Sequence, residues 1–292
     1  MGGTRPLKAF RHLMEAIKVE HTLFALPLAL SGMVLGAKGL PPGGKVLWVS
    51  LAMVGARTAA MAFNRLADEA YDARNPRTRG RPLPSRRIGR GSLWGLTVAG
   101  VGLTTASAWR LNPLALRLAP LALGWVLFYS FTKRFTWACH LCLGLAVALA
   151  PVGGWIGVRG DVGLSVLLLG GATALWVAGF DVIYGCLDYD FDRAVGLHSL
   201  PVKLGIQRAL GVAALFHLGA LGLFLACGLS AGLGLIWMGG LGVVAGLLGA
   251  EHFILHPYNP SKVPVAFFPL NAAVSLVVFS ALSLDLWFGG GR

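Results

Sequence analysis

The sequence predicts an all-α fold, a polytopic bundle of about nine transmembrane helices, on three observations. Of the 292 residues, 56 % are apolar and only 13 % are charged, whereas a soluble domain has about 25 % charged residues. The apolar residues also fall in blocks of about 18–22, the length that a helix needs to cross a hydrocarbon core of ~30 Å. These features exclude a disordered chain, a disulfide scaffold and an ordinary cytosolic enzyme. We interpret residues 1–292 as one integral membrane domain.

Nine candidate spans follow one another, each defined by its apolar run and several by signals at their ends. Asn112 followed by Pro113 is typical of a helix start, and Ser92 and Asp161 are expected N-caps. Prolines inside four of the spans are tolerated because neighbouring helices of a membrane bundle accommodate the kinks. A short uncharged turn near Ser230 separates the seventh and eighth spans. The expected spans are residues 20–38, 46–65, 92–109, 113–131, 138–157, 162–184, 208–228, 231–250 and 264–287.

Glycine is abundant, with 41 residues, and some of it is spaced for helix packing. Small residues four positions apart on one helix face allow two backbones to approach closely in a membrane. We therefore expect close-packed faces at three pairs: Gly32 with Gly36, Gly228 with Gly232, and Gly242 with Gly246.

The basic residues predict the orientation in the membrane, because cytoplasmic loops carry an excess of Lys and Arg. If the N-terminal segment, residues 1–19, is cytoplasmic, 18 of the 25 basic residues lie on that side and six on the other, while Arg57 lies inside a span. The formal net charge of +13 is then a consequence of topology. A lipid bilayer is the expected partner, and nucleic acid is not required.

Seven of the twelve acidic residues occur in only two short segments. These segments lie at the cytoplasmic ends of the second and sixth expected spans. Since charge is costly near a membrane core, such a concentration indicates a functional site. The seven acids are Asp68, Glu69, Asp72, Asp181, Asp188, Asp190 and Asp192.

Both acidic segments repeat polar residues at helical spacing. Residues four apart share one face of a helix, so each segment predicts a stripe. The first stripe contains Asn64, Asp68 and Asp72. The second contains Asp181, Tyr184, Asp188 and Asp192, with Asp190 off it. The shared spacing, 120 residues and four helices apart, indicates a weak four-helix internal repeat with a site between its two halves.

Carboxylates that repel one another on a helix face are best explained by a bound cation. Oxygen ligands without His or Cys favour a hard cation, Mg²⁺ or Ca²⁺. A calcium loop starting at Asp188 is excluded, because Arg193 stands where that loop needs Gly and Ser199 where it needs Glu. Mg²⁺ uses one or two carboxylates and completes its shell with water and phosphate oxygens. The two segments therefore predict a magnesium-dependent clamp for a phosphorylated ligand.

Basic residues beside the acids fit the same ligand. Arg77 and Arg79 follow the first stripe directly, and Lys133 and Arg134 end another span on the same side. Guanidinium and ammonium groups suit phosphate oxygens. Arg57 lies two turns deeper in the membrane than Asn64, and an intramembrane arginine is a functional-site hypothesis by default. It could form a salt bridge with an acid, or it could bind an anionic group of a second substrate.

These motifs resemble those of a known family. Asn64-x3-Asp68-x3-Asp72-x3-Pro76-Arg-Thr-Arg-x-Arg81-Pro-Leu-Pro84 and Asp181-x2-Tyr184-x3-Asp188-x3-Asp192 are similar to the two signature motifs of the UbiA superfamily of intramembrane aromatic prenyltransferases. Tyr129-x3-Lys133-Arg134-Phe-Thr, Gly196-Leu-His-Ser-Leu-Pro201 and Glu20-His21-Thr-Leu-Phe-Ala-Leu-Pro27 resemble its ubiquinone and menaquinone branch, which includes the 4-hydroxybenzoate polyprenyltransferases. The resemblance covers residues 15–280. One departure is Arg65, where many members have Asp.

The resemblance implies nine helices around a central cavity and the Mg²⁺-dependent transfer of a polyprenyl or geranylgeranyl group from its diphosphate to an aromatic acceptor. The implied acceptor is 4-hydroxybenzoate or a related quinone-precursor acid. The implied catalytic residues are Asp68, Asp72, Asp181, Tyr184, Asp188 and Asp192. Two Mg²⁺ ions are expected on Asn64, Asp68, Asp72, Asp188 and Asp192. The diphosphate is expected on Asn64, Arg77, Arg79, Lys133 and Arg134, and the acceptor on Arg57 and His21.

Two alternatives remain at the level of sequence. Prenyl transfer to a glycerol phosphate would make an ether lipid on the same scaffold. A transporter of a phosphorylated lipid belongs to a different class, but transporters place their charged site near the midplane on broken helices, whereas these acids cluster at one face. The sequence leaves the oligomeric state open.

Overall fold

The computed structural model is all-α, as predicted, and describes residues 5–19, 22–256 and 258–289, which contain no strand. Within these residues, nine long helices occupy the nine expected spans, and shorter helices join them. The elements are α1 (Arg5–Ile17), α2 (Thr22–Ala37), α3 (Gly43–Ala67), α4 (Glu69–Arg74), α5 (Arg90–Leu111), α6 (Pro113–Thr132), α7 (Cys139–Arg159), α8 (Leu164–Gly185), η2 (Cys186–Asp188), α9 (Tyr189–Val195), α10 (Leu200–Leu204), α11 (Ile206–Ala231), α12 (Leu235–Ile254), η3 (Pro260–Lys262) and α13 (Val263–Phe288).

Seven of the long helices in the described chain are long and apolar enough to cross a membrane: α3, α6, α7, α8, α11, α12 and α13. The apolar part of α2 is shorter, at Ala25–Ala37, and α5 is not among the seven. The length and composition of these helices identify an integral membrane protein.

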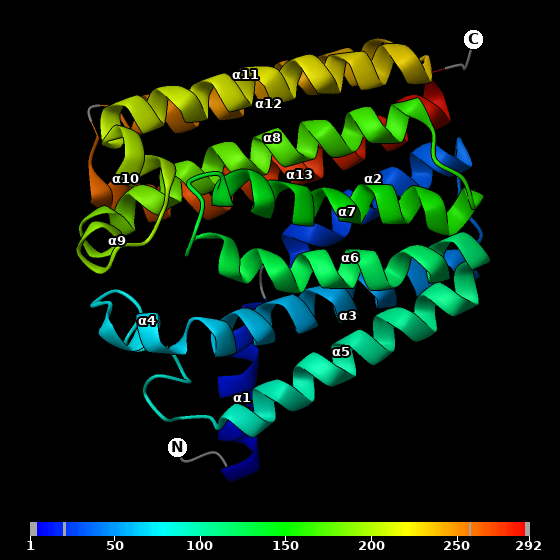
Figure 1. Ribbon diagram of the computed structural model, residues 1–292. Coiled ribbons are helices and arrows are strands. Elements are labelled where there is room, and N and C mark those ends of the chain that lie inside the picture. Colours follow the sequence, from blue (N-terminus) through cyan, green and yellow to red (C-terminus); the bar gives the residue numbers. More distant parts are fainter. Residues whose placement is uncertain (1–4, 20–21, 257, 290–292) are drawn as a thin grey trace.

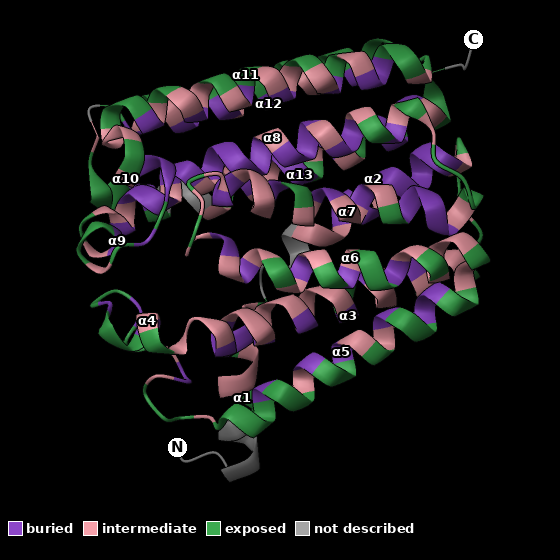
Figure 2. Ribbon diagram, in the orientation of Figure 1, coloured by how far each residue is buried: buried purple, intermediate pink, exposed green. Residues whose placement is uncertain are grey.

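The helices form a bundle in which α8 is the central element. Figure 2 shows α8 buried along most of its length, whereas α5 and α11 expose one face. Many residues of α12 are exposed as well. The short helices α4, α9 and α10 gather at one end of the bundle, and the C-terminal end of α13 lies at the other (Figure 1). The two acidic segments therefore meet at a single end of the molecule.

Three expected helix starts had different outcomes. The Asn112 start is confirmed, because the side-chain oxygen of Asn112 accepts a hydrogen bond from the Ala115 amide at 2.9 Å. The Ser92 cap is wrong, since α5 already begins at Arg90. The Asp161 cap is also wrong, because α8 begins at Leu164 and the Asp161 carboxylate instead accepts hydrogen bonds from the Arg159 guanidinium.

The first expected glycine packing face is confirmed. A Cβ placed on Gly32 would overlap the carbonyl oxygen of Pro151 on α7, so α2 and α7 touch backbone to backbone there. One turn later, a Cβ on Gly36 would lie 3.4 Å from Trp155, also on α7. The absence of side chains at both positions therefore allows the two helices to pack closely.

The other two glycine pairs behave differently. Gly228 packs against the indole of Trp237, but Gly232 adopts a φ of +70° just after α11 and contacts nothing within 4 Å of its missing methyl position. The second pair is thus half confirmed. Gly242 and Gly246 also have open space within 4 Å of where a Cβ would stand, so the packing face expected there is wrong.

Neither acidic stripe lies on one continuous helix, which corrects the expectation of straight stripes. The backbone leaves the helix at Asp68, with φ −95° and ψ 5°, between α3 and α4. It leaves it again at Asp188, with φ −101° and ψ 5°, between α8 and α9. The same break occurs at the corresponding acid of each motif. We call the α3–α4 segment and the α8–α9 segment the two acidic arms. After each break, the last acid of the motif, Asp72 or Asp192, lines the cavity between these arms.

Candidate active site

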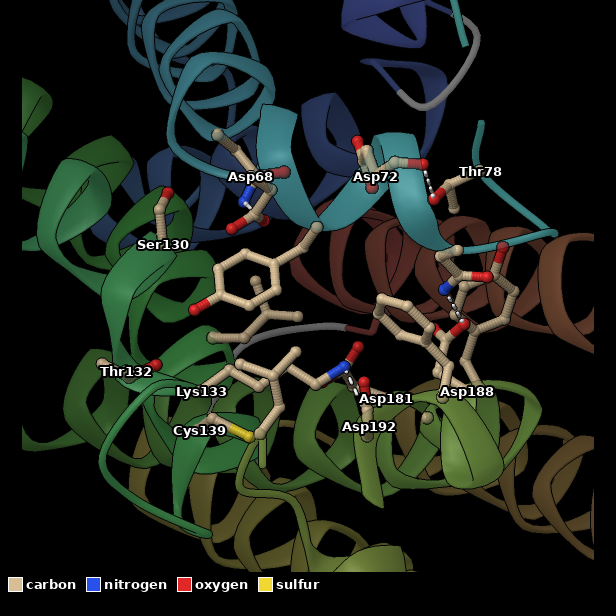
Figure 3. A pocket seen from close by; sticks show the side chains of 18 of the residues that line it. Asp68, Asp72, Thr78, Ser130, Thr132, Lys133, Cys139, Asp181, Asp188 and Asp192 are labelled. Carbon is tan, nitrogen blue, oxygen red and sulfur yellow. Dashed lines mark hydrogen bonds and ion pairs between the residues drawn. The ribbon is translucent and has the colours of Figure 1, made fainter. Parts of the chain in front are cut away.

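A polar cavity of about 280 Å³ lies between the two acidic arms. Figure 3 shows Asp68 and Asp72 on one side of it and Asp181, Asp188 and Asp192 on the other. The cavity lining also includes Asn64, Tyr184, Arg77, Lys133 and Arg134. The tertiary structure thus brings together both acidic motifs and the basic residues between them.

Asp188 is the most extensively bonded of these acids. The Arg77 guanidinium donates to both carboxylate oxygens, its Nε reaching Oδ1 at 2.8 Å, and Asn75 Nδ2 donates to Oδ1 at 2.8 Å. Asn75 also accepts a hydrogen bond from the Arg77 amide at 2.9 Å, which is a local turn typical of Asn. Arg77 donates in addition to the Tyr184 hydroxyl at 2.9 Å. Two residues of the loop after α4 therefore hold the arm formed by α8 and α9.

Asp72 is paired with Arg81 rather than with Arg77. Arg81 Nη1 lies 2.8 Å from each carboxylate oxygen of Asp72, and Arg65 Nη1 lies 3.9 Å away. Thr78 Oγ1 donates to the Asp72 carbonyl at 3.1 Å, which folds the loop back over α4. Asp72 is buried, and these two guanidinium groups are the cations that lie beside its carboxylate.

Lys133 connects the end of α6 to the second acidic arm. Its ammonium lies 2.7 Å from Oδ2 of Asp192, a carboxylate with 1 % of its side chain exposed. Burial lowers the pKa of Lys133, but the Asp192 carboxylate more than offsets it and the net shift is upward. The lysine therefore stays charged at the edge of the cavity, where it suits an anionic ligand.

Asp68 has the most distant cationic partner of the carboxylates expected to bind magnesium. Asn64 Nδ2 donates to it at 3.0 Å, but Arg134 Nη2 is 3.7 Å away. Burial and the nearby Asp72 carboxylate raise the pKa of Asp68 to about 6. The charged form of Asp68 thus lacks full compensation from the chain, which fits a carboxylate that shares an added cation.

The donor set fits Mg²⁺ when a phosphorylated ligand supplies part of the coordination. Carboxylate and amide oxygens of Asn64, Asp68, Asp72, Asp188 and Asp192 line the cavity. Within residues 5–19, 22–256 and 258–289, no three His, Cys, Asp or Glu side chains converge on one point. Mg²⁺ is usually held by one or two carboxylates and by substrate phosphates, so a divided set of acids suits it.

A second cavity, of about 640 Å³ and mostly apolar, adjoins the first. Alanine, leucine and valine side chains of α3, α6 and α7 form much of its wall. Tyr129, Asp181 and Tyr184 line both cavities and mark the place where they meet. A compartment lined by charged side chains therefore shares part of its wall with an apolar one.

Arg57 lines the apolar cavity rather than the acidic one. Its guanidinium donates to the backbone carbonyls of Ile17 at 3.1 Å and Lys18 at 3.0 Å, at the C-terminal end of α1. Its position within the span formed by α3 is as predicted. His21, the other residue expected to bind the acceptor, lies outside the described residues.

Some residues of the site were not identified from the sequence. Arg79 is exposed and does not line the cavity, whereas Arg81, two residues on, does. Arg65 lines both cavities and bonds the Ala16 carbonyl of α1 at 3.0 Å. Asn75 and His140 were also missed. The signal for Asn75 was available, since an Asn-Pro pair directly after an acidic helix is typical of a turn that returns to the site.

Comparison with known proteins agrees with this geometry. Residues 25–277 match the model of the UbiA prenyltransferase family. The chain belongs to that family. A 4-hydroxybenzoate octaprenyltransferase of Shewanella frigidimarina is 30 % identical over 284 residues, covering 96 % of this chain and 97 % of that protein. A second one, from Enterobacter sp., is 31 % identical over 283 residues and covers 96 % of each chain. This UbiA-family chain is a prenyltransferase by these relationships.

Solved UbiA structures have the same fold. The apo structure of a UbiA homologue from Aeropyrum pernix is 36 % identical, with a TM-score of 0.84, covering 91 % of this chain and 98 % of that one. A UbiA homologue from Archaeoglobus fulgidus bound to GPP and Mg²⁺ is 19 % identical, with a TM-score of 0.71, covering 93 % and 99 %. The second similarity concerns the fold alone.

Proposed function

We propose that this UbiA-family enzyme transfers a polyprenyl or geranylgeranyl group from its diphosphate to an aromatic acid, 4-hydroxybenzoate or a related quinone precursor. One observation carries the proposal: a cavity lined by charged side chains, suited to a diphosphate, shares a wall with a larger apolar cavity suited to a prenyl chain, and Asp181 and Tyr184 line both. The named relatives at about 30 % identity support the choice of acceptor.

The charged cavity is the site of the diphosphate. Arg77, Arg81 and Lys133 each bond a carboxylate and lie at the cavity wall, where they can also donate to phosphate oxygens. We assign the same role to Arg134, which also lines this cavity, and not to Arg79, which is exposed outside the lining. Asn64, Asp68, Asp72, Asp188 and Asp192 would hold two Mg²⁺ ions, which would neutralise the negative charge that develops on the leaving diphosphate. The basic residues add donors that favour the same charge separation.

The apolar cavity is the site of the prenyl chain. Loss of diphosphate leaves an allylic cation, which water would capture if it reached the reacting carbon. Alanine and leucine side chains of α6 and α7 line this cavity and exclude water from it. The acceptor ring is then the available nucleophile. Its carbon forms the new bond to the allylic cation, and the same carbon then loses its proton to the released diphosphate or to water, which restores the aromatic ring and completes the electrophilic substitution.

The acceptor lies between the two cavities. Arg57 would bind its carboxylate, with His21 as a second acceptor contact, and Asp181 or Tyr184 would orient its hydroxyl. Asp181 and Tyr184 line both cavities, and Arg57 lines the apolar one. The site would thus offer a cation to one end of the acceptor and a hydrogen-bonding group to the other end. An aromatic hydroxy acid, which has a carboxylate and a hydroxyl, requires both.

The topology that accompanies this function has nine membrane crossings, with α2 and α5 joining the seven apolar helices. We place the N-terminus and the loops around α4 and α9 in the cytoplasm, on the strength of the basic residues that surround them. The matching backbone breaks at Asp68 and Asp188 support the four-helix repeat.

The test is an assay of purified enzyme with labelled prenyl diphosphates of several lengths, with either Mg²⁺ or EDTA. Separate reactions contain 4-hydroxybenzoate, a naphthoate acid and a glycerol phosphate. We expect a Mg²⁺-dependent prenylated product from an aromatic acid. A product from glycerol phosphate alone would assign an ether-lipid synthase, and the absence of a metal-dependent product from every acceptor would refute the enzymatic function.

A further inference from the structure

His140 is a buried histidine near the start of α7, and both of its ring nitrogens are bonded. Nδ1 lies 2.7 Å from Oδ2 of Asp181. The backbone N–H of Leu200 donates to Nε2 at 3.3 Å. A backbone amide can only donate, so Nε2 must be the acceptor and Nδ1 carries the proton. His140 therefore donates a hydrogen bond to the Asp181 carboxylate.

The packing around the imidazole fixes its orientation. Only 3 % of His140 is exposed. A Cβ added to Gly185 of α8 would lie 3.0 Å from Cε1 of the ring, so glycine leaves the space that the ring fills. With Gly185 on one side and the Leu200 amide on its far nitrogen, the ring is held against Asp181 in one orientation.

A set of contacts between two loops supports the same histidine. The His198 amide donates to the Lys133 carbonyl at 2.7 Å, and Cys139 Sγ donates to the His198 carbonyl at 3.4 Å. These contacts join the connection between α6 and α7 to the segment that precedes α10. Lys133 and His140 stand at the two ends of that connection. The connection between α6 and α7 therefore supplies one partner to each of two acids: Lys133 contacts Asp192, and His140 contacts Asp181.

The hydrogen bond from His140 orients the Asp181 carboxylate, which faces the proposed acceptor site. It lines both cavities, and 26 % of its side chain remains exposed beside the buried imidazole. It stands on α8, before the backbone break at Asp188, and does not belong to the proposed magnesium ligands. Without the His140 hydrogen bond, its carboxylate would be free to rotate at the junction of the cavities.

We propose that His140 is a positioning residue for the prenyl-transfer reaction. It holds the Asp181 carboxylate in the orientation that aligns the acceptor hydroxyl. The proposal rests on the function proposed above. It extends the reaction site to the first residue of α10, because the Leu200 amide fixes the imidazole.

The test compares two substitutions of His140 in the full-length enzyme. His140→Leu removes both ring nitrogens, and we expect kcat to fall about 10- to 100-fold, as for a displaced catalytic group. The KM for prenyl diphosphate should stay near the wild-type value, because no diphosphate contact changes. His140→Asn places an amide N–H close to the position of Nδ1, and it should restore most of the lost kcat.

A buried histidine elsewhere provides the matched control. His217 on α11 is also 3 % exposed, pairs with His252 and lines neither cavity. His217→Asn should leave kcat near the wild-type value, whatever it does to thermal stability. This control separates loss of a buried imidazole in general from loss of the one beside Asp181.

A double-mutant cycle tests whether the effect of His140 on kcat depends on Asp181. If His140 acts through Asp181, His140→Leu should cost little further kcat in an Asp181→Asn background. Independent, additive losses would overturn the proposal, and so would a His140→Asn enzyme as slow as His140→Leu. A wild-type enzyme that gives no product would refute both the proposed function and this inference. An active wild-type enzyme together with a His140→Leu variant of unchanged kcat would refute this inference alone.

Discussion

The Arg77 guanidinium donates hydrogen bonds to both carboxylate oxygens of Asp188, a residue 111 positions later in the chain. This contact joins the loop after α4 to the break between α8 and α9, and it closes one side of the charged cavity between the acidic arms. Since the same guanidinium also reaches Tyr184, it connects the proposed diphosphate site to the junction with the apolar cavity.

Substitution of Arg77 should therefore impair catalysis more than its charge alone would suggest. We expect Arg77→Lys, which keeps the charge but loses the bidentate geometry, to lower kcat/KM for prenyl diphosphate by about tenfold, and Arg77→Ala by about a hundredfold. Steady-state kinetics with varied prenyl diphosphate measure both. Arg86→Ala is the control, because Arg86 is exposed and lies away from the cavity lining. Equal losses in Arg77→Ala and Arg86→Ala would contradict the assignment.

Asp68 should determine the affinity for magnesium. Its carboxylate has the most distant cationic partner among the proposed ligands, so we expect Asp68→Asn to raise the Mg²⁺ concentration for half-maximal activity by about 10- to 100-fold. Activity measured over a Mg²⁺ titration tests this. Asp161→Asn, at an exposed site on the α7–α8 connection outside the cavity lining, should leave the titration midpoint unchanged. An unchanged midpoint in Asp68→Asn would exclude Asp68 as a ligand.

Arg57 should affect the acceptor more than the donor. The acceptor carboxylate requires a cation in the apolar cavity, so Arg57→Ala should raise the acceptor KM at least about tenfold, the loss expected for a charged hydrogen bond. The KM for prenyl diphosphate should change far less. Arg57→Lys, which retains the charge, should show a smaller effect. An equal rise of the two KM values in Arg57→Ala would contradict the carboxylate role. The rise would then come from the end of α1, which loses its hydrogen bonds to the Arg57 guanidinium.

The contact between α2 and α7 should be sensitive to one methyl group. A Cβ on Gly32 would meet the Pro151 carbonyl oxygen, so Gly32→Ala must push the helices apart and should destabilise the protein by about 1–3 kcal/mol. Thermal unfolding in detergent measures the loss. Gly242→Ala is matched in chemistry but faces open space, and it should unfold near the wild-type temperature. Similar unfolding temperatures for the two variants would contradict the packing argument.

The positions of the nine long helices were predictable because hydropathy is a local property of about twenty consecutive residues. The acids of the site were predictable for a related reason: in a chain with twelve acids, seven in two short segments are conspicuous. The break at Asp68 was not predictable, since its helical spacing is compatible with a continuous helix.

The partners of the acids required the tertiary structure. Arg79 and Arg81 are two residues apart with the same chemistry, and the fold-back of the loop at Thr78 brings Arg81 to Asp72 while it leaves Arg79 exposed. His140 carries no local signal at all, because its partner Asp181 lies 41 residues away on another helix. Composition and spacing thus establish the membrane bundle and the acidic motifs, which depend on near neighbours in the chain. The pairing of charges depends on which helices pack together, and that is decided by the burial of whole helix faces around α8.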